Sequence, residues 1–433
     1  MTDKEVVDVI KKDLVIIGAG PAGMCAAASA YENGIRDILI LEREHTVGGI
    51  LKQCIHTGFG LHRFGEELTG PEYAYRCEKV INEYGIECMT DATVISLGHN
   101  GKEKIVTVSH AQKGCFDIHA GAVILAMGCR ERSRGAVNTA GTRPAGVFSA
   151  GTAQKYVNIM GVMPGKSVVI LGSGDIGLIM ARRMTLEGAK VKAVCEIMPY
   201  SGGLTRNIVQ CLDDYGIPLK LSHTILKIHG KKRVSGVTIA EVDSNRKVIP
   251  GSEEYIECDT VLYSVGLIPE NELTRMYGVP LDPATSGARV DQYRQTETEG
   301  IFACGNVLHV HDLADYVSEE AEIAGKGAAR YLKSKGEERA EKRKNVCAGN
   351  GVRYTVPQFI TGNSDVSVFF RTDNVYENIC IVISDGERQL LRIKKRRVSP
   401  GEMQRIDLKK DMIDKMKSEK LCVSLETGTE TGG

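Results

Sequence analysis

The chain has 433 residues, enough for two to three domains with sizeable cores. Lysine plus arginine equal aspartate plus glutamate at 55 each, so no basic surplus favours nucleic-acid binding. The sequence has no run of about 18 apolar residues, which excludes a typical membrane-spanning helix.

The N-terminal segment 1–13 contains acidic residues and no apolar core, which is not typical of a secretory signal. We therefore expect a cytoplasmic protein. The thirteen cysteines are spread singly from Cys25 to Cys422, without any CxxC or CxxxxC spacing. Because structural zinc sites need short paired spacings, we expect no metal site and predict that most cysteines are buried thiols.

Residues 14–42 have the pattern of a strand, a glycine-rich turn, an alanine-rich helix and a second strand. In the GxGxxG formed by Gly18, Gly20 and Gly23, the first glycine permits a tight turn and the second lets the backbone approach a pyrophosphate. The third lets the helix pack close to the sheet, and the helix N-terminus offers N–H groups to phosphates. Glu42 ends the second strand and is placed to accept hydrogen bonds from ribose hydroxyls.

The same pattern returns 154 residues later, at 168–196. Each key position of the first unit has a counterpart, without a gap. The counterparts of Gly18, Gly20, Gly23, Gly34, Glu42 and the pair Gly48–Gly49 are Gly172, Gly174, Gly177, Gly188, Glu196 and the pair Gly202–Gly203. A lone GxGxxG is a weak sign, but two complete units in the same order indicate two dinucleotide sites.

Three further strand-like segments end at glycines where the chain could pass close to a ligand. They are 121–132 with Gly128, 256–271 with Gly266 and Pro269, and 296–306 with Gly305 and Asn306. A helix is expected after the last of them, with Asp315 or Ser318 as its N-cap.

The rest of the chain has a different composition. The charged segment 333–345 is predicted to be a solvated helix end and linker. Residues 350–425 contain short alternating runs separated by Gly, Asn, Asp and Pro, which predict a small β-rich domain. Its basic stretch LRIKKRRV is predicted to be a solvated strand, and our hypothesis for this domain is subunit docking.

This order of motifs resembles that of the two-dinucleotide-binding-domain flavoproteins, the superfamily of pyridine nucleotide-disulfide oxidoreductases, over roughly residues 12–335. The resemblance implies an α/β fold of two Rossmann-like domains, the second inserted in the first. The residue pattern of 350–425 adds a small C-terminal β-rich domain to this fold. The expected parts are an FAD-binding domain in two pieces (1–140 and 291–335) and an NAD(H)-binding domain (141–290), followed by a charged linker (336–349) and the β-rich domain (350–433).

The resemblance also implies which residues bind the cofactors. Those for FAD are Gly18, Gly20, Gly23, Glu42, Arg43, Val94 through its backbone, Gly128, Gly305, and Asn306, which replaces the acidic residue of the family. Those for the nicotinamide cofactor are Gly172, Gly174, Gly177 and Glu196, and Gly49 and Gly266 are also expected at the cofactors.

Glu196 favours NAD(H) over NADP(H), because a carboxylate suits a free 2′-hydroxyl and repels a 2′-phosphate. Arg182, Arg183 or Arg206 could still accommodate a phosphate. Asp175 departs from the pattern, since a carboxylate beside a pyrophosphate is unfavourable unless it points away.

The redox cysteine pair of the family's disulfide reductases is absent, and its two positions fall on Leu51 and His56. We therefore do not expect disulfide reduction by an internal dithiol. His56 and Cys54 are the candidate catalytic residues. His56 suits proton exchange or could only orient its loop, and Cys54 is either reactive or a buried thiol. Structural or surface roles are predicted for His62, His309 and His311.

The block GGILKQCIHTGFG (48–60) is similar to a subgroup of flavoprotein subunits that includes relatives of opine and sarcosine oxidase subunits, hydrogen cyanide synthase and proteins linked to glycerol-3-phosphate dehydrogenase. We predict an FAD-dependent oxidoreductase that transfers hydride between NADH and flavin. Electrons would pass to or from a partner dehydrogenase, a redox subunit or a small acceptor, in an oligomer or hetero-complex. The alternatives are a flavoprotein subunit of an amine or hydroxy-acid (glycerol-3-phosphate-type) dehydrogenase and a cofactor-binding structural subunit.

Overall fold

The computed structural model describes residues 10–334, 343–362 and 364–427, so the first half of the predicted linker, 336–342, lies outside the described residues. The chain divides into two compact units. Unit 1 comprises 1–52, 57–129 and 269–433, and unit 2 comprises 53–56 and 130–268. The chain enters unit 2 after residue 129 and leaves it after residue 268, whereas the predicted domain limits were 140 and 290.

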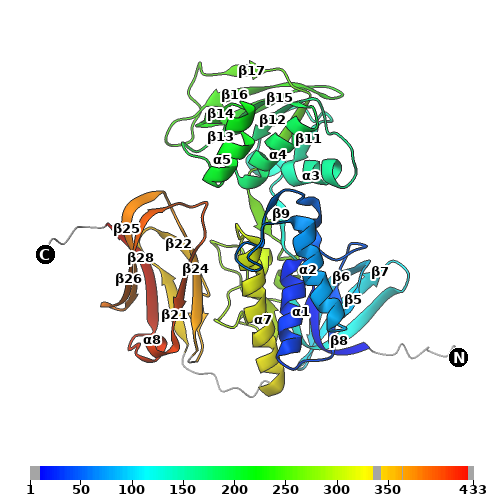
Figure 1. Cartoon of the computed structure of the whole chain (residues 1–433), viewed down its shortest axis with the longest axis vertical. Coiled ribbons are helices and arrows are strands. Elements are labelled where there is room, and N and C mark those ends of the chain that lie inside the picture. Colours follow the sequence, from blue (N-terminus) through cyan, green and yellow to red (C-terminus); the bar gives the residue numbers. More distant parts are fainter. Residues whose placement is uncertain (1–9, 335–342, 363, 428–433) are drawn as a thin grey trace. The chain divides into compact units, whose positions relative to one another are not determined.

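Unit 1 contains a sheet in the strand order β5–β2–β1–β8–β7–β6, with β20 also paired to β8. Its strands β5 to β8 are labelled in Figure 1. Its strands are β1 (Ile10–Ile17), β2 (Ile38–Leu41), β5 (Glu87–Met89), β6 (Ala92–Asn100), β7 (Glu103–His110), β8 (Gly114–Leu125) and β20 (Ile301–Ala303). The strands β5, β2, β1, β8 and β20 run parallel, whereas β8, β7 and β6 form an antiparallel meander. The long strand β8 belongs to both parts, because it pairs in parallel with β1 and β20 and antiparallel with β7.

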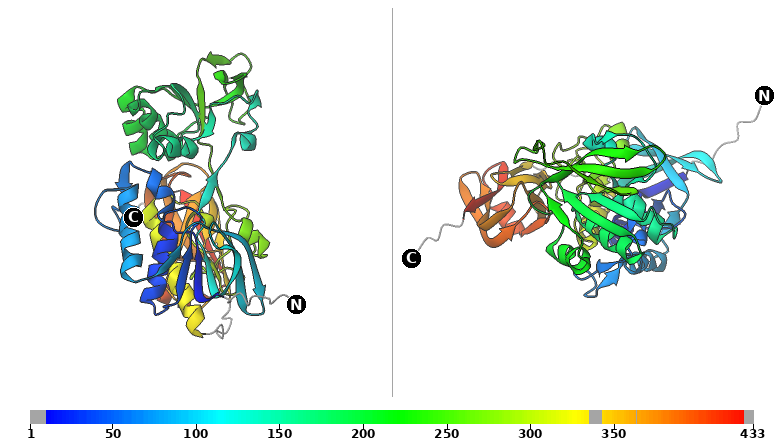
Figure 2. Two further views of the ribbon diagram at one scale, coloured as in Figure 1. Left: turned by 90° about the vertical axis from the view of Figure 1, so that its right-hand side faces the viewer. Right: turned by 90° about the horizontal axis from the view of Figure 1, so that it is seen from above.

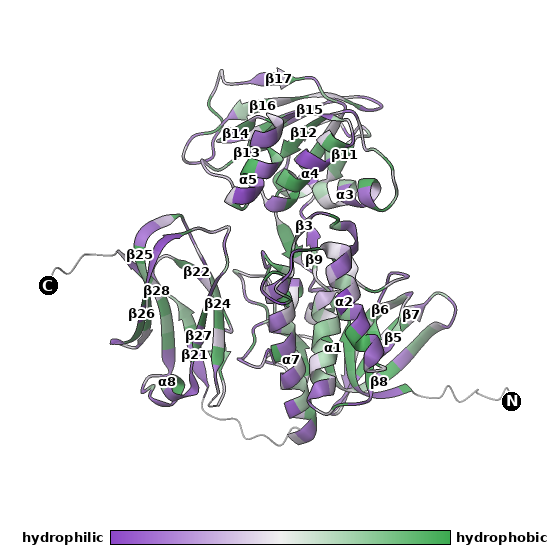
Figure 3. Cartoon of the chain, viewed as in Figure 1, coloured by the Kyte–Doolittle hydropathy of each residue, from purple (hydrophilic) through white to green (hydrophobic). Residues whose placement is uncertain are grey.

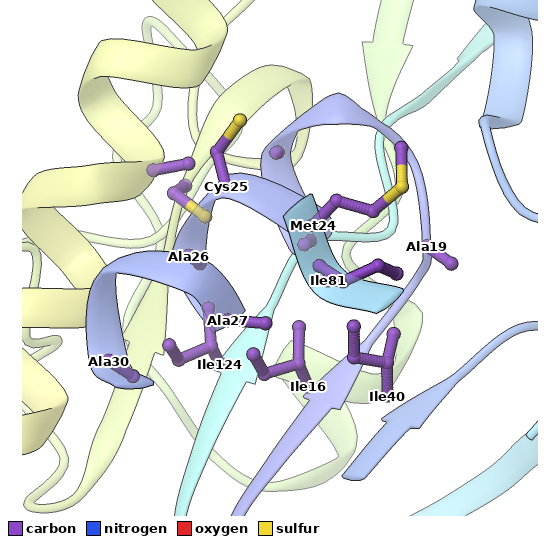
Figure 4. Packing of buried hydrophobic residues seen from close by; sticks show 14 of the residues in the cluster. Ile16, Ala19, Met24, Cys25, Ala26, Ala27, Ala30, Ile40, Ile81 and Ile124 are labelled. Atoms are coloured by element: carbon purple, nitrogen blue, oxygen red, sulfur yellow. The ribbon is translucent and has the colours of Figure 1, made fainter. Parts of the chain in front are cut away.

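Three helices of unit 1 share one hydrophobic core with this sheet: α1 (Pro21–Glu32), α2 (Gly70–Glu83) and α7 (Ala314–Ser334). The small residues of α1 let it lie close to the strands, where Ala26, Ala27 and Ala30 pack near Ile16 and Ile124 (Figure 4). Figure 2 shows α1 and α2 on one face of the sheet. Helix α7 carries both hydrophobic and hydrophilic residues, and its buried residues recur every three to four positions, as expected for a helix with one buried face (Figure 3). Shorter elements of unit 1 are η1 (Gly49–Gln53), β3 (Thr57–Phe59), β4 (Leu68–Thr69), α6 (Glu272–Met276) and η4 (Gly305–Val307).

Unit 2 repeats the design with the fully parallel sheet β11–β18–β12–β13–β14, beside a second sheet β10–β15–β16–β17. Its strands are β10 (Ala140–Gly141), β11 (Val147–Ser149), β12 (Ser167–Leu171), β13 (Lys190–Glu196), β14 (Leu219–Leu221), β15 (His223–Gly230), β16 (Val234–Glu241), β17 (Glu254–Ile256) and β18 (Thr260–Tyr263). Its helices are η2 (Arg134–Val137), α3 (Ala150–Asn158), α4 (Asp175–Leu186), α5 (Thr205–Cys211) and η3 (Asp213–Tyr215). The strands β9 (Cys129–Glu131) and β19 (Leu267–Pro269) connect the units and pair with each other. The predicted insertion of a second Rossmann-like domain into the first is thus confirmed.

The C-terminal segment forms two small sheets, β23–β21–β28–β25–β26 and β22–β24–β27, which confirms the predicted β-rich region. Its elements are β21 (Lys344–Ala348), β22 (Val352–Val356), β23 (Phe359–Ile360), β24 (Val366–Thr372), β25 (Tyr376–Asp385), β26 (Arg388–Val398), β27 (Gln404–Leu408), α8 (Lys410–Asp414) and β28 (Lys420–Thr427). The basic stretch is the edge strand β26 and is largely exposed, as predicted. Four buried side chains of this segment join the core on the other face of the unit 1 sheet: Tyr354, Val356, Phe369 and Met403. The β-rich segment is therefore built into unit 1.

Among the helices in the described part of the chain, none has the length and apolar character needed to cross a membrane.

Candidate functional site

The first glycine-rich turn contains two glycines that close packing requires and a third that leaves room for a ligand. Gly18 has a φ of +105°, and a Cβ there would lie 2.5 Å from the carbonyl oxygen of Ala126. A Cβ on Gly23 would lie 1.8 Å from the carbonyl oxygen of Gly18. A Cβ on Gly20 would meet no heavy atom within 4 Å, so the backbone here faces open space. This is the arrangement expected where a pyrophosphate lies against the start of a helix.

Glu42 is held beside this turn. Its Oε2 accepts a hydrogen bond from the Ala19 N–H at 2.8 Å, and its Oε1 accepts one from the Glu44 N–H at 2.9 Å. Since a carboxylate can accept about four hydrogen bonds, capacity remains for ribose hydroxyls. Arg43 is exposed next to it.

Val94 is brought to the same edge of the sheet. The Ala92 N–H donates to the Glu42 carbonyl oxygen at 2.9 Å, which places the start of β6 beside the end of β2. The pairing of β6 with β7 shifts register between Val94 and Ser96, and such irregularities re-aim the backbone.

The remaining residues predicted to bind FAD also lie in unit 1, where β1, β8 and β20 end. Gly49 supports the turn, because a Cβ there would lie 3.0 Å from the Cα of Gly20. Gly305 has a φ of +73°, and its Cβ would lie 2.9 Å from that of Ala22. The Asn306 Nδ2 lies 3.6 Å from the Sγ of Cys129, which follows Gly128 in the chain. The structure thus gathers residues that are up to 288 positions apart in the sequence around one helix start.

The second turn, in unit 2, has the same division of roles. A Cβ on Gly172 would lie 2.0 Å from the Ser264 carbonyl oxygen, and one on Gly177 would lie 2.5 Å from the Gly172 carbonyl oxygen. At Gly174 the nearest atom would be the Ser264 Oγ, at 3.7 Å, so this position again has space. Gly266 follows the neighbouring strand β18, and its carbonyl oxygen accepts from the Arg132 N–H at 3.0 Å.

Glu196 stands where Glu42 stands in unit 1. It accepts hydrogen bonds from the Ser173 N–H at 2.9 Å, the Ser173 hydroxyl at 2.7 Å and the Met198 N–H at 3.0 Å. The carboxylate is therefore fixed at the rim of the second turn, where it can accept a further hydrogen bond from a ribose hydroxyl.

The structure explains why Asp175 is compatible with a pyrophosphate site. Its Oδ1 accepts from the Leu204 N–H at 2.8 Å and from the Asn207 Nδ2 at 2.6 Å. The carboxylate thus points to the start of α5, and its charge is used to fasten the loop that follows the second glycine pair.

The candidate catalytic residues Cys54 and His56 both belong to unit 2. Burial raises the pKa of the Cys54 thiol to about 12, so the thiol stays protonated near neutral pH. This favours the buried-thiol interpretation over a nucleophile. Burial, followed by the positive charges of Arg182 and Arg206, lowers the pKa of His56 to about 4. His56 is therefore a neutral imidazole at pH 7, able to accept or donate a hydrogen bond but a weak base.

The structure brings together two thiols that the sequence does not connect. The Sγ atoms of Cys25 in α1 and Cys77 in α2 lie 3.8 Å apart, and both residues are buried. This exceeds a disulfide bond length of about 2 Å, so the pair is in thiol contact.

A buried network of charged and polar side chains lies next to Gly305 and Asn306. The Glu320 carboxylate, in α7, accepts four hydrogen bonds, each 3.0 Å long, two on each oxygen. The donors are Arg294 Nε and His309 Nε2 to Oε1, and the Gly305 N–H and His311 Nε2 to Oε2. The side chains of Arg294, His309, His311 and Glu320 are at most 1% exposed. Arg294 and Glu320 were not predicted from the sequence, and only structural or surface roles were predicted for the two histidines.

The hydrogen bonds define the charges in this network. Because a carboxylate only accepts, both imidazoles must donate through Nε2, and their buried Nδ1 atoms have no hydrogen-bond partner in the structure. A proton on Nδ1 would be a buried donor without an acceptor, so neutral rings are favoured. Burial would raise the pKa of Glu320, but its positively charged and donor neighbours hold it well below its usual range. Arg294 and Glu320 therefore balance each other.

Within the described part of the chain, His309, His311 and Glu320 are also the one group with the composition of a metal site. The four donors already occupy the acceptor capacity of the carboxylate, and Arg294 places a fixed positive charge 3.0 Å from it. Both features disfavour a divalent cation. The arrangement is that of a hydrogen-bonded charge network.

We expect this network to make unit 1 sensitive to acid. Burial lowers the pKa of His309 to about 4, below the ordinary histidine value of 6.5, so the unfolded chain takes up this proton first as the pH falls. The stabilising contribution is complete above pH 6.5 and is lost progressively between pH 6.5 and pH 4, by about 3 kcal/mol. Urea unfolding between pH 7 and pH 4 measures this slope. His309→Gln, which keeps a donor but does not titrate, should flatten it, and an unchanged slope would contradict the assignment.

Helix α7 begins earlier than its predicted N-cap residues. It starts at Ala314, so Asp315 lies in its first turn and Ser318 in its second. Both side chains are buried, and the Ser318 hydroxyl lies 2.7 Å from that of Tyr73. The N-cap prediction was wrong because the helix already begins at Ala314, before both residues.

A sequence model described as pyridine nucleotide-disulphide oxidoreductase matches residues 12–336. The chain is 25% identical over 337 residues to an opine oxidase subunit of Agrobacterium tumefaciens, an alignment that covers 73% of this chain and 64% of that protein. It is also 25% identical over 337 residues to hydrogen cyanide synthase subunit HcnB of Pseudomonas protegens, covering 73% of this chain and 69% of that protein.

Among solved structures, the thioredoxin reductase of T. acidophilum superposes with a TM-score of 0.59 at 26% identity, covering 76% of this chain and 99% of that one. The chain thus matches a complete thioredoxin reductase chain but slightly less than two thirds of the opine oxidase subunit.

Proposed function

The chain belongs to the pyridine nucleotide-disulphide oxidoreductase family, whose members are flavin-dependent NAD(P)H oxidoreductases, and on this premise we propose that it transfers hydride between NADH and bound FAD. One observation carries the proposal. The same glycine-rich turn occurs once in each unit, and in each the middle glycine, Gly20 or Gly174, faces space beside a fixed carboxylate.

In this proposal the residues of unit 1 bind and orient FAD, which supplies two-electron chemistry when bound. The turn at Gly20 and the start of α1 would receive the pyrophosphate, and Glu42 would accept from the ribose. The start of α7 would direct the positive end of its helix dipole to the flavin. Cys54 has no part in proton or electron transfer in this proposal, because its thiol stays protonated. His56 would act as a neutral hydrogen-bonding group in the loop that contains it.

The contacts around the second turn support NADH over NADPH. Glu196 is held as a carboxylate at the position where a 2′-phosphate would lie. Two of the three arginines that could have offset its charge are engaged elsewhere. Arg183 pairs with Glu187 at 2.5 Å, and the Nε of Arg182 lies 3.4 Å from the Tyr215 hydroxyl.

The electron partner is proposed to be another protein or a small acceptor, because the internal redox cysteines of the family's disulfide reductases are absent. The second candidate function is that of a flavoprotein subunit in an amine or hydroxy-acid dehydrogenase. It is supported by two relatives, both of which are named as subunits of larger enzymes. A cytoplasmic location and an oligomeric or hetero-complex assembly stay predictions.

Anaerobic titration of the FAD-reconstituted protein tests the proposal. We expect NADH to bleach the flavin absorbance at a concentration about tenfold or more below that needed with NADPH, because Glu196 repels the 2′-phosphate. Gly174→Ala should weaken the NADH response by about tenfold or more while FAD stays bound, since Gly174 belongs to unit 2. Preference for NADPH would overturn the nucleotide assignment. Bound flavin that neither nucleotide reduces would favour the subunit function.

A further inference from the structure

The loop 305–312, which follows β20 and contains Gly305 and Asn306, is held by the C-terminal β segment. Arg371 in β24 donates from its Nη2 to the Val310 carbonyl oxygen at 3.0 Å and forms an ion pair with Asp312. The other oxygen of Asp312 accepts from the Met403 N–H at 2.6 Å. The Nη1 of Arg371 donates to the Pro400 carbonyl oxygen at 2.8 Å, which fixes the guanidinium within its own segment.

The same segment supplies the apolar cover of the charge network. The ring centroid of Phe369 lies 5.8 Å from that of His309 and 5.7 Å from that of His311. The Tyr354 ring lies 6.1 Å from His309, edge to face. Phe369 is completely buried, so these contacts keep water away from the hydrogen bonds to Glu320.

From this loop the contacts continue to the residues proposed to bind FAD. The His311 N–H donates to the Asn306 Oδ1 at 3.0 Å, and the Glu320 Oε2 accepts from the Gly305 N–H at 3.0 Å. His311 therefore orients the Asn306 amide. Arg371 in turn holds the loop that contains His311, through its contacts with Val310 and Asp312. Each step in this chain of contacts is a short hydrogen bond or an ion pair within unit 1.

We propose that the C-terminal β segment is a structural part of the FAD site, in which Arg371 and Asp312 are positioning residues for Gly305 and Asn306. The inference rests on the proposed FAD site. An ordered loop binds its ligand more tightly, because the entropy of ordering it is not lost on binding. This role is separate from our hypothesis of subunit docking for the same segment, which stays a prediction.

The experiment compares two arginines of the same segment. Arg371 contacts the loop 305–312, whereas Arg392 in β26 forms an ion pair with Glu426 in β28. In Arg371→Gln the full-length protein should bind FAD with a dissociation constant raised about tenfold or more, measured by flavin fluorescence. Amide hydrogen exchange at residues 306–312 of the FAD-free protein should become faster by a similar factor. Arg392→Gln should change the dissociation constant by less than about twofold, even where both variants lower the melting temperature equally.

Arg371→Lys keeps the positive charge without the forked geometry, so its FAD affinity should lie between those of wild type and Arg371→Gln. If Arg371→Gln does not fold, Arg371→Lys is used in its place. The inference is overturned if wild type binds FAD and both Arg371 variants match it in affinity and in hydrogen exchange of the loop. Failure of wild type to bind FAD would instead overturn the proposed function. Hydrogen exchange in the FAD-free variants would still show whether Arg371 orders the loop.

Discussion

Glu320→Gln is expected to lower the free energy of unfolding by about 3–5 kcal/mol, the cost typical of breaking a buried ion pair by removing one partner. The carboxylate has four donors around it, so the amide nitrogen of glutamine would face donors in place of accepting from them. Arg294, which is fully buried, would lose its counter-charge. The loop 305–312 would lose the bond at Gly305, so FAD affinity should fall as well. Urea unfolding of the FAD-free protein, with flavin fluorescence for binding, measures both effects.

Glu319→Gln is the matched control, one residue away on the same helix. Glu319 pairs with Arg405 at the surface, where the two side chains are 32% and 30% exposed. Its loss should cost less than about 1 kcal/mol. If Glu320→Gln were as mild as Glu319→Gln, the carboxylate would not be the centre of the network.

The sequence predicted the parts of the fold that are encoded locally. The spacing of Gly18, Gly20 and Gly23 is a property of consecutive residues, because the turn, the helix start and the close packing of helix on strand all occur within one βαβ segment. The structure shows the physical reason directly, since a Cβ at Gly18 or Gly23 would collide with backbone oxygen. Repetition of the whole unit made the two Rossmann-like domains predictable without any long-range information.

What the sequence could not predict depends on contacts between distant residues. Arg294 and Glu320 are 26 positions apart and meet only after β20 and α7 pack together. A signal was present, because Glu320 lies three residues after Val317 and four before Ala324, on the buried face of α7. An acidic residue in that register indicates a buried partner, but the sequence does not name it. The docking of Phe369 and Arg371 on the loop 305–312 had no signal, since their strand pattern was explained by the small β-rich region itself.

The sequence left two interpretations open for each of Cys54 and His56, because residue type and spacing do not show burial. Both residue types are reactive in water, and their spacing beside a glycine pair made a redox or proton-transfer role reasonable. Burial shifts the pKa of Cys54 upward and, with Arg182 and Arg206, shifts that of His56 downward. Residue type thus sets the ordinary pKa, whereas the surroundings, which only the structure shows, decide the charge at neutral pH.

Gly18→Ala is expected to lower mainly the stability of the fold, and Gly20→Ala is expected to weaken mainly FAD binding. At Gly18 the φ of +105° and the approach of 2.5 Å to a backbone oxygen should lower the free energy of unfolding by about 3 kcal/mol or more. Gly20 is the N-cap of α1, with a φ of −73° that alanine adopts easily, and its Cβ would meet no atom. Its replacement should therefore cost less than about 1 kcal/mol in the FAD-free protein.

The ligand reverses this order of severity. A methyl group at Gly20 would occupy the space proposed for the pyrophosphate, so we expect the FAD dissociation constant to rise about 30- to 100-fold, equivalent to ~2–3 kcal/mol. Urea unfolding of FAD-free protein and fluorescence titration with FAD separate the two effects, because Gly20→Ala should change only the second strongly. Gly174→Ala is the matched control in unit 2 and should leave FAD binding unchanged. Wild-type FAD affinity in Gly20→Ala would mean that the open space at the start of α1 does not hold the pyrophosphate.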